Sequence, residues 1–240
     1  MFGENPVRHS EVREDRKLQV HNIFYTLQGE GPFAGDPSVF IRLSGCNLRC
    51  SFCDTQWDDE NDPYLTVDEI YDRVAAEYDH YKIKPIRKLI IITGGEPLRQ
   101  DLSRLFHRLS WLSGKVTFQI ETAGTLWQDC LLREDVYIVC SPKTPKINES
   151  IWNNASAFKY VIRNGLTDQE DGLPLMNTQI AYAEPVKLAR PRPGARVYLS
   201  PCDEIGFPEL TKANEKEVVR LALKHGYTAG LQLHKIWNVE

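Results

Sequence analysis

Apolar residues recur along the chain in short, nearly continuous runs that are rich in Val and Ile. Such runs are typical of strands that are buried on both faces, as in a parallel sheet covered by other elements. On this basis the sequence predicts strands over 20–25, 39–43, 89–93, 116–121, 136–140, 158–162, 197–199 and 230–234.

Apolar residues at helical spacing follow some of these strands. Thr66 and, three residues later, Glu69 form the pattern of a capping box, which marks the start of a helix. Segment 102–112 is apolar along one face and predicts a second helix. A third helix is expected from Asn214 to Gly226, because glycine readily adopts the left-handed conformation that often ends a helix.

The alternation of strands and helices predicts an α/β fold with a parallel sheet or barrel. Segment 163–196 is rich in Pro, Gly, Asn and Asp and has no clear helical pattern. A complete eight-fold barrel typically takes about 250 residues and a helix after every strand. The sequence therefore predicts a partial, open barrel in which some helices are replaced by loops. Residues 1–17 alternate in charge without apolar periodicity, so we expect a flexible or loosely docked N-terminal tail and a single domain over 18–240.

Composition excludes several classes of function. The net charge is −4 and the isoelectric point is about 5.9, so nothing suggests non-specific binding of nucleic acid. No apolar run is long enough to span a membrane, and the first residues have no secretory-signal pattern. Six cysteines are too few for a disulfide framework, which favours the reducing cytoplasm.

Three of the cysteines follow the second predicted strand closely. Cys46, Cys50 and Cys53 have the spacing Cys-x3-Cys-x2-Cys. Three thiolates can bind three irons of a [4Fe–4S] cluster and leave the fourth iron open to a small molecule, because soft sulfur ligands suit iron–sulfur centres. The same residues could instead hold zinc together with a distant histidine, or serve as structural thiols.

Polar segments follow three other predicted strands. They are Thr-Gly-Gly-Glu-Pro at 93–97, Glu-Thr-Ala-Gly-Thr at 121–125 and Ser-Pro-Lys at 141–143. Two glycines at a strand end allow a ligand to approach the backbone closely, and α/β folds bind ligands at the carboxyl ends of parallel strands. Each segment alone could be an ordinary turn. In a parallel barrel, however, all of them converge with the cysteine loop at one mouth.

The cysteine loop followed by Gly-Gly-Glu-Pro resembles the radical S-adenosylmethionine (SAM) superfamily, which implies a (β/α)6-type barrel. Further segments narrow the resemblance to the 7-carboxy-7-deazaguanine synthase family: Leu-Gln-Gly-Glu-Gly at 27–31, Phe-Ile-Arg-Leu-Ser-Gly-Cys at 40–46, Cys-Asp-Thr at 53–55 and Leu-Gln-Leu-His-Lys at 231–235. The resemblance runs from about residue 20 to the C-terminus.

The resemblance also implies a role for individual residues. The cluster would be held by Cys46, Cys50 and Cys53. SAM on the open iron would contact Phe52, Cys53, Asp54, Gly95, Ser141, Pro142 and Lys143. The substrate, 6-carboxy-5,6,7,8-tetrahydropterin, would contact Leu27, Gln28, Gly29, Arg42 and Thr93, with His234 and Glu240 near its ring. Thr55 would help to hold Mg2+ beside the substrate carboxylate.

The residue types suit these roles. The planar guanidinium of Arg42 can donate two hydrogen bonds to a carboxylate, and an unpaired charge inside its apolar run would be costly. Mg2+ prefers oxygen ligands, which a threonine hydroxyl can supply. Without the resemblance, Thr55 would be interpreted as a cap or turn residue.

The implied activity is a radical ring contraction of the pterin to 7-carboxy-7-deazaguanine with loss of ammonia, on the pathway to queuosine and other 7-deazapurines. The resemblance also implies a homodimer, and a flavodoxin-like protein is the expected electron donor. Two other functions stay open: an activase of a glycyl-radical enzyme, which acts on a protein substrate, and a non-catalytic zinc or iron–sulfur binding module.

Overall fold

The computed structural model describes residues 5–53, 55, 61–81, 87–176 and 186–239. In this part of the chain the main sheet has the strand order β11-β10-β7-β6-β5-β4-β2-β1-β3. Its strands are β1 (Leu18–Leu27), β2 (Pro37–Leu43), β3 (Tyr64–Leu65), β4 (Arg87–Gly94), β5 (Lys115–Thr122), β6 (Val136–Cys140), β7 (Ala157–Ile162), β10 (Val197–Pro201) and β11 (Thr228–Ala229). A small antiparallel pair consists of β8 (Leu175–Met176) and β9 (Val186–Lys187).

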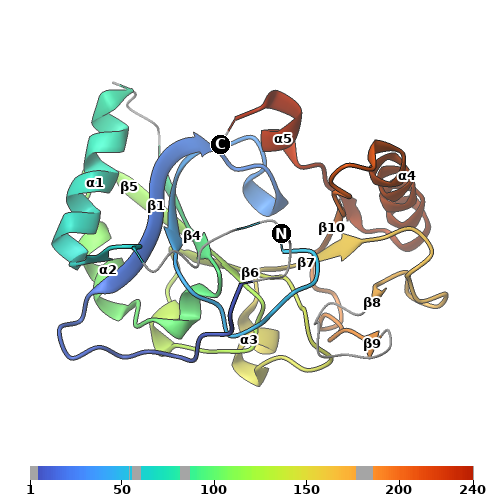
Figure 1. The fold of residues 1–240 in the computed structure, drawn as a ribbon, viewed down its shortest axis with the longest axis horizontal. Helices are drawn as coiled ribbons and strands as arrows, with labels where there is room; N and C mark the ends of the chain where they lie inside the picture. The colour runs from blue at the N-terminus through green and yellow to red at the C-terminus, as the bar shows by residue number, and fades with distance from the viewer. Residues whose placement is uncertain (1–4, 54, 56–60, 82–86, 177–185, 240) are drawn as a thin grey trace.

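The centre of the sheet is the predicted open barrel. Strands β2, β4, β5, β6, β7 and β10 are neighbours in this order and run parallel to one another. Strand β1 pairs antiparallel with β2 and bends strongly along one edge (Figure 1). The two edges of the sheet, β3 and β11, are not paired with each other, so the barrel is open. This confirms the expected partial barrel of the (β/α)6 type.

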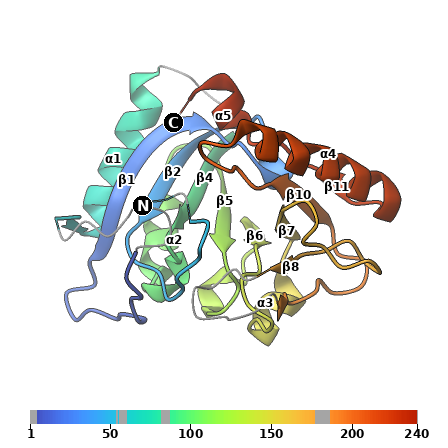
Figure 2. The ribbon, with the colours of Figure 1, turned by 45° about the vertical axis from the view of Figure 1, so that its right-hand side comes forward.

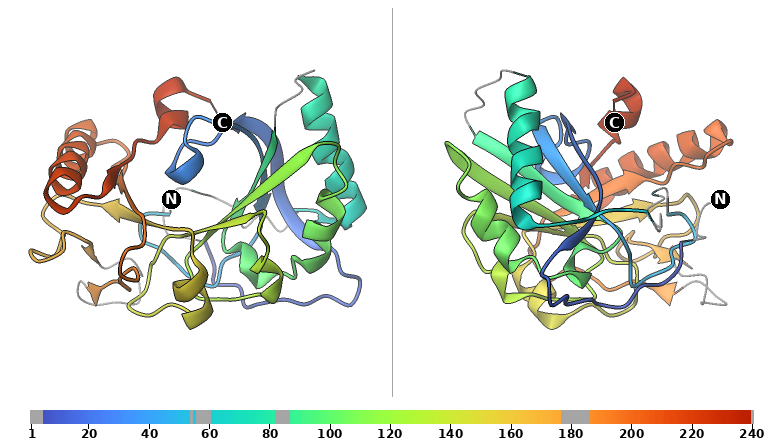
Figure 3. Two further views of the ribbon diagram at one scale, coloured as in Figure 1. Left: turned by 180° about the vertical axis from the view of Figure 1, so that it is seen from behind. Right: turned by 60° about the vertical axis from the view of Figure 1, so that its left-hand side comes forward.

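Four described helices lie between strands of the sheet: α1 (Val67–His80), α2 (Ser103–Leu109), α3 (Glu149–Asn154) and α4 (Pro208–His225). A fifth, α5 (Leu233–Trp237), follows the last strand. The two long ones, α1 and α4, lie at opposite ends of the sheet (Figure 3). A single 3-10 turn, η3 (Asp129–Leu131), stands between β5 and β6. Between β7 and β10, the described residues 163–176 and 186–196 contain β8 and β9 but no helix. Loops therefore replace helices in two connections of the described chain, as predicted.

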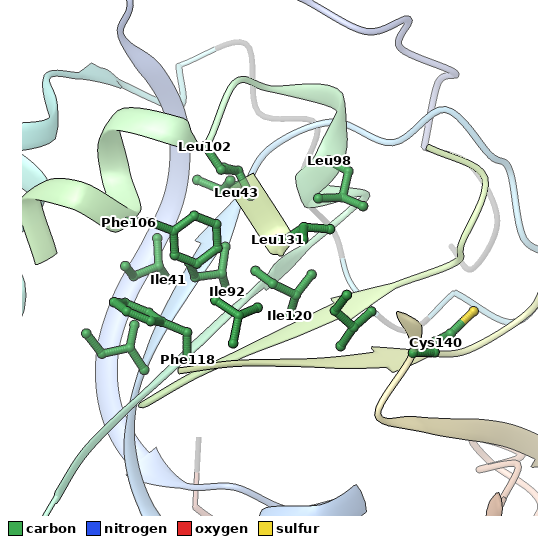
Figure 4. Close-up of a cluster of buried hydrophobic side chains, with 14 of the residues drawn as sticks. Ile41, Leu43, Ile92, Leu98, Leu102, Phe106, Phe118, Ile120, Leu131 and Cys140 are labelled. Carbon is green, nitrogen blue, oxygen red and sulfur yellow. The ribbon is translucent and has the colours of Figure 1, made fainter. Parts of the chain in front are cut away.

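The hydrophobic core lies between the sheet and the helices on its outer face. Alternate residues of β2 and β4, among them Ile41 and Ile92, point to this side and are fully buried. Leu102 and Phe106 of the α2 region pack over them (Figure 4). Burial of one such side chain stabilises the fold by about 1.5–3 kcal/mol. Because residues alternate between the faces of a strand, this packing turns the intervening residues toward the inside of the barrel.

Two of the predicted helix ends are confirmed. The hydroxyl of Thr66 accepts a hydrogen bond from the backbone N–H of Glu69, whose carboxylate accepts one from the backbone N–H of Thr66. Helix α4 ends at Gly226 in the left-handed conformation, with φ of 75°. It begins at Pro208, ahead of the predicted Asn214, since proline is well suited to the first turn of a helix.

The predicted strand over 230–234 was wrong. The last strand, β11, ends before it, and the helix α5 begins at Leu233. The backbone N–H of Leu233 donates to the carbonyl oxygen of Gly29 at 3.2 Å. This contact draws the C-terminal segment over the end of β1 instead of along the sheet edge (Figure 2). A contact between distant segments therefore decides the conformation here.

The N-terminal segment contacts the rest of the chain at several described positions. Val7 forms a parallel bridge with Cys46, and Glu11 forms one with Gln100. The carboxylate of Glu11 also pairs with the guanidinium of Arg99, whose side chain is buried. Charged residues without apolar periodicity are held here by hydrogen bonds and ion pairs. None of the helices in the described ranges is both long and apolar enough to cross a membrane.

Candidate active site

A cavity of about 570 Å³ opens at the carboxyl edge of the parallel strands. Its walls contain nearly all the described residues that the sequence proposed for the site. They are Leu27, Gln28, Gly29, Arg42, Cys46, Cys50, Phe52, Cys53, Thr55, Thr93, Gly95, Ser141, Lys143 and His234. Pro142 is buried beside the cavity but does not line it. Asp54 and Glu240 lie outside the described residues.

The period of two along each strand explains why polar side chains gather here. Inward positions are apolar near the middle of the sheet, as at Phe40 and Ile91, and polar two residues later, at Arg42 and Thr93. The same face of the neighbouring strands continues this polar lining with Glu121, Lys159, Arg163 and Ser200. Parallel strands end at the same edge, so these residues from distant parts of the sequence share one space.

The cysteine loop forms one wall of the cavity. The backbone N–H of Leu48 donates to the sulfur of Cys46 at 3.4 Å, and the backbone N–H of Cys53 donates to the carbonyl of Cys50 at 3.3 Å. The side chain of Asn47 donates to Thr125 at 2.8 Å, which ties the loop to the chain after β5. Burial, and secondarily the charge of Glu96, raise the pKa of the Cys46 thiol to about 12.

All three cysteines of the loop line the same cavity. Their thiolates are soft sulfur ligands of the kind that bind the irons of a [4Fe–4S] cluster. Each thiolate can bind a different iron, and the fourth iron is then left open to a small molecule in the cavity.

The two glycines at the end of β4 have a role that the sequence did not reveal. A Cβ atom on Gly94, which has φ of +130°, would overlap the carbonyl oxygen of Leu43. One on Gly95 would overlap the carbonyl oxygen of Gly45, just before the first cysteine. The glycines therefore let the end of β4 lie directly against the start of the cysteine loop. Gly95 also lines the cavity, where a ligand can approach it.

Glu96 of the same segment joins the ends of two strands. Its carboxylate is fully buried and accepts hydrogen bonds from the backbone N–H of Leu98, the hydroxyl of Thr122 and the backbone N–H of Ala123. Its own backbone N–H donates to Gly45 at 2.9 Å. Burial raises the pKa of Glu96, although these donors and the charge of Lys143 act in the opposite direction.

Replacement of Glu96 by alanine is expected to destabilise the fold. It leaves the buried donors of Leu98, Thr122 and Ala123 without an acceptor, which should lower the free energy of unfolding by roughly 2–4 kcal/mol. Urea unfolding followed by circular dichroism measures the change. Glu134→Ala, at an exposed position, is the matched control and should have almost no effect. Equal free energies of unfolding of the two variants would contradict the proposal that the hydrogen bonds of Glu96 stabilise the fold.

Glu121 is a site residue that was not among the predicted contacts. Its carboxylate accepts hydrogen bonds from the side chains of Gln28 at 3.0 Å, Gln119 at 3.1 Å and Thr93 at 3.1 Å. Two predicted substrate contacts, Gln28 just after β1 and Thr93 in β4, are thus held by one acid. Its position at the end of a predicted strand could have indicated a site residue. Its hydrogen-bond partners could not be predicted from the sequence, since Gln28 precedes it by 93 residues.

Two lysines place positive charge in the cavity. Lys159 forms an ion pair with Glu30 at 2.5 Å. Burial would raise the pKa of Glu30, but the ammonium of Lys159 outweighs burial and holds the pKa below its usual value. Burial lowers the pKa of Lys143, whose ammonium donates to the carbonyl and hydroxyl of Ser141 at 2.8 and 2.5 Å.

Arg42 differs from the other cations of the cavity. Its guanidinium lies 5.1 Å above the ring of Phe24, which is stacked on Phe40. Among the described residues no carboxylate or other side chain forms an ion pair or hydrogen bond with it. A half-buried guanidinium in this setting can donate two parallel hydrogen bonds to an anionic group of a ligand.

The C-terminal segment also contributes to the cavity wall, through Gln232, His234 and Lys235. A Cβ atom on Gly29 would overlap the imidazole of His234, so the Gln-Gly-Glu-Gly segment and the C-terminal helix are in direct contact. Lys235 forms an ion pair with Asp203 at 2.8 Å. Arg163 pairs with Glu204 at 2.7 Å and lies 5.7 Å from the ring of Phe52 in the cysteine loop.

The chain is similar in sequence to known proteins. Residues 40–139 match the model of the radical SAM superfamily. A 7-carboxy-7-deazaguanine synthase from Rhodospirillum rubrum is 41% identical over 245 residues, which cover 100% of both chains. One from Rickettsia prowazekii is 38% identical, covering 100% of this chain and 96% of that protein.

A solved structure resembles the fold. The crystal structure of QueE from Escherichia coli matches with a TM-score of 0.58, covering 90% of this chain and 94% of that one. The two sequences are 21% identical, so this likeness concerns the fold: a mostly parallel, open sheet with helices on its outer side.

Proposed function

Since the chain belongs to the 7-carboxy-7-deazaguanine synthase family of radical SAM enzymes, we propose that it converts 6-carboxy-5,6,7,8-tetrahydropterin to 7-carboxy-7-deazaguanine with loss of ammonia. One observation carries this proposal. The segments typical of this family, around Gln28 and His234, meet the three cysteines on the walls of one cavity. A volume of about 570 Å³ lies within the range of small-molecule sites, roughly 300–1,000 Å³.

Membership of the radical SAM superfamily implies a [4Fe–4S] cluster and SAM. When bound, they supply a 5′-deoxyadenosyl radical that abstracts hydrogen from C6 of the substrate. The cluster ligands in our proposal are Cys46, Cys50 and Cys53. SAM is expected to contact Phe52, Cys53, Asp54, Gly95, Ser141, Pro142 and Lys143. The protein contributes orientation and exclusion of water, because a reactive radical must meet only the substrate.

The substrate side of the cavity is formed by β1, β2, β4 and β5. The fork of Arg42 is suited to the carboxylate of the pterin. The acids and amides around Glu121 and Gln28 can pair with polar groups on the pterin ring, and Thr93 is held beside them. Leu27, Gly29, His234 and Glu240 complete the proposed contacts. Lys143 and Lys159 can stabilise negative charge or supply a proton as ammonia leaves.

Thr55 is proposed as a protein ligand of Mg2+ in the substrate complex. It lines the cavity next to the last cysteine, and a hydroxyl together with substrate oxygens and water matches the preference of Mg2+ for hard ligands. Mg2+ would act as a template for the substrate carboxylate.

Thr55→Ala is expected to weaken the binding of Mg2+ during turnover while leaving iron and sulfide content unchanged. The Mg2+ concentration for half-maximal rate should rise about tenfold, which corresponds to the loss of one ligand of about 1.4 kcal/mol. Thr55→Ser retains the hydroxyl and should behave like the wild type. An unchanged Mg2+ response in Thr55→Ala removes this residue from the proposed site.

We also propose a homodimer and a flavodoxin-like electron donor, and a cytoplasmic location. The family resemblance suggests the dimer. Exposed apolar side chains near the C-terminus, Leu231, Ile236 and Trp237, are available for contacts between copies. The low-potential reaction needs an external one-electron donor, and an oxygen-sensitive cluster suits a reducing compartment.

An anaerobic turnover assay tests the reaction. Reconstituted protein is incubated with dithionite, SAM, Mg2+ and the tetrahydropterin, and the products are identified by mass spectrometry. Appearance of 7-carboxy-7-deazaguanine with 5′-deoxyadenosine is the expected result. SAM cleavage without the deazaguanine would retain the superfamily and reject the substrate. An activase of a glycyl-radical enzyme would instead need its protein partner before it cleaved SAM productively.

A further inference from the structure

The N-terminal segment lies against the cysteine loop, although none of its residues was among the predicted site residues. Two backbone hydrogen bonds hold it there. The N–H of Arg8 donates to the carbonyl of Cys46 at 2.7 Å, and the N–H of Glu11 donates to the carbonyl of Arg99 at 2.7 Å. These two bonds fix the path of residues 8–11 beside the cysteine loop, and Asn5, three residues before Arg8, lies at the cavity wall.

Asn5 is the described residue that this path brings to the cavity wall. Its side-chain nitrogen lies 2.7 Å from the carbonyl oxygen of Thr55 and 3.7 Å from the sulfur of Cys53. A side-chain amide carries two N–H donors, so it can serve both acceptors at once. The carbonyl of Thr55 holds the amide in place, and the second N–H faces the sulfur of a predicted cluster ligand.

The bonding of Cys53 changes when it binds iron. As a free thiol it can donate its proton, and here it lies 3.5 Å from the carbonyl of Thr55. As a thiolate it has no proton and can only accept hydrogen bonds. The Asn5 amide then remains well placed as a donor to the sulfur. Such bonds to cluster sulfurs are among the features that set the reduction potential of an iron–sulfur centre.

The sign of the effect follows from charge. Reduction adds one electron to the cluster and makes its sulfurs more negative. A donor N–H stabilises the more negative state more strongly, because charge-assisted hydrogen bonds are stronger than neutral ones. Its presence therefore raises the reduction potential and makes the cluster easier to reduce.

We propose that Asn5 is a positioning residue that raises the reduction potential of the cluster, and that the N-terminal segment is thereby part of the active-site wall. The inference rests on the proposed function, since it requires the three cysteines to bind the cluster. The process concerned is the one-electron reduction of the cluster from its 2+ to its 1+ state. The electron comes from an external low-potential donor, a reduced flavodoxin-type protein or dithionite.

An anaerobic redox titration of the holoenzyme tests this proposal, with the reduced cluster counted by electron paramagnetic resonance. Asn5→Leu has a side chain of similar size without donors. At the midpoint potential of the wild type, its ratio of reduced to oxidised cluster should be about three- to tenfold lower. A tenfold change corresponds to a shift of about 59 mV to more negative potential for one electron. Val12→Ala, in the same segment at an 82% exposed position, is the matched control and should keep the wild-type midpoint.

The possible outcomes distinguish a failure of the role of Asn5 from a failure of the proposed function. A wild-type midpoint in Asn5→Leu overturns the inference and leaves the proposed function intact. Wild-type protein that binds no cluster overturns both. Lower iron content in Asn5→Leu does not affect the test, because the resonance counts only molecules that carry a reduced cluster. If that variant takes up no iron at all, Asn5→Ala replaces it, and an unshifted midpoint there overturns the inference equally.

Discussion

Replacement of Cys50 by alanine is expected to abolish the visible absorption of the cluster and all cleavage of SAM. Cys50 is the middle ligand of the proposed set, and its carbonyl also accepts the N–H of Cys53. With two thiolates left, the cluster loses one of its three attachments to the protein. The reductive cleavage of SAM depends on the cluster, so binding of SAM by the rest of the cavity should give no residual cleavage. Anaerobic reconstitution, iron and sulfide analysis and detection of 5′-deoxyadenosine measure the effect.

The matched control is another cysteine outside the cavity. Cys130 is half-buried in the turn η3, where its sulfur lies 3.4 Å from the side chain of Gln128. Cys130→Ala should retain about four iron and four sulfide per chain and cleave SAM at the wild-type rate. Full activity of Cys50→Ala would reject the cluster assignment. One zinc per chain and no sulfide in the wild type would favour the zinc module instead.

The second large effect is expected for Arg42. Replacement by alanine removes the guanidinium that we assign to the substrate carboxylate. Loss of hydrogen bonds to a charged group should cost about 3 kcal/mol, or roughly 100-fold in kcat/KM for deazaguanine formation. The change should appear mainly as a higher KM for the pterin, because the contact binds a group that does not react. Cluster content should be unchanged, since Arg42 contacts no cysteine in the described interactions.

Two further variants define the origin of this loss. Arg42→Lys keeps the charge but not the planar fork, so an intermediate kcat/KM is expected. Arg87 is the first residue of the neighbouring strand β4, at the amino ends of the parallel strands and away from the cavity. There it forms an ion pair with Asp36. Arg87→Ala should change kcat/KM by less than about twofold, as surface ion pairs contribute little. An unchanged kcat/KM in Arg42→Ala would exclude this residue from substrate binding.

The sequence was a good guide wherever the information is local. The run of Val and Ile in each central strand, the capping box at Thr66 and the glycine that ends α4 are all found where they were predicted. These features depend on neighbouring residues only. The convergence of the strand-end motifs also followed from a general property, namely that parallel strands end at one edge of the sheet.

The sequence was a poor guide where contacts join distant segments. The C-terminal segment has a pattern suitable for a strand, yet it begins a helix where Leu233 meets Gly29. Strand propensity depends strongly on the surroundings, so such a contact can reverse it. The N-terminal segment has no apolar pattern at all. Its place beside the cysteines is decided by backbone hydrogen bonds and by the ion pair of Glu11 with Arg99.

The sequence by itself therefore determined the positions of the central strands, the cysteine motif and fourteen of the residues on the cavity wall. Only the tertiary structure decided how they work together. In the folded protein, Glu121 accepts hydrogen bonds from both Gln28 and Thr93. Gly94 and Gly95 have no side chains there, which allows β4 to pack closely against the cysteine loop. The physical reason is that side-chain identity and period are properties of a short segment. Hydrogen-bond partners and steric gaps depend on which segments the folded sheet brings within a few ångströms of each other.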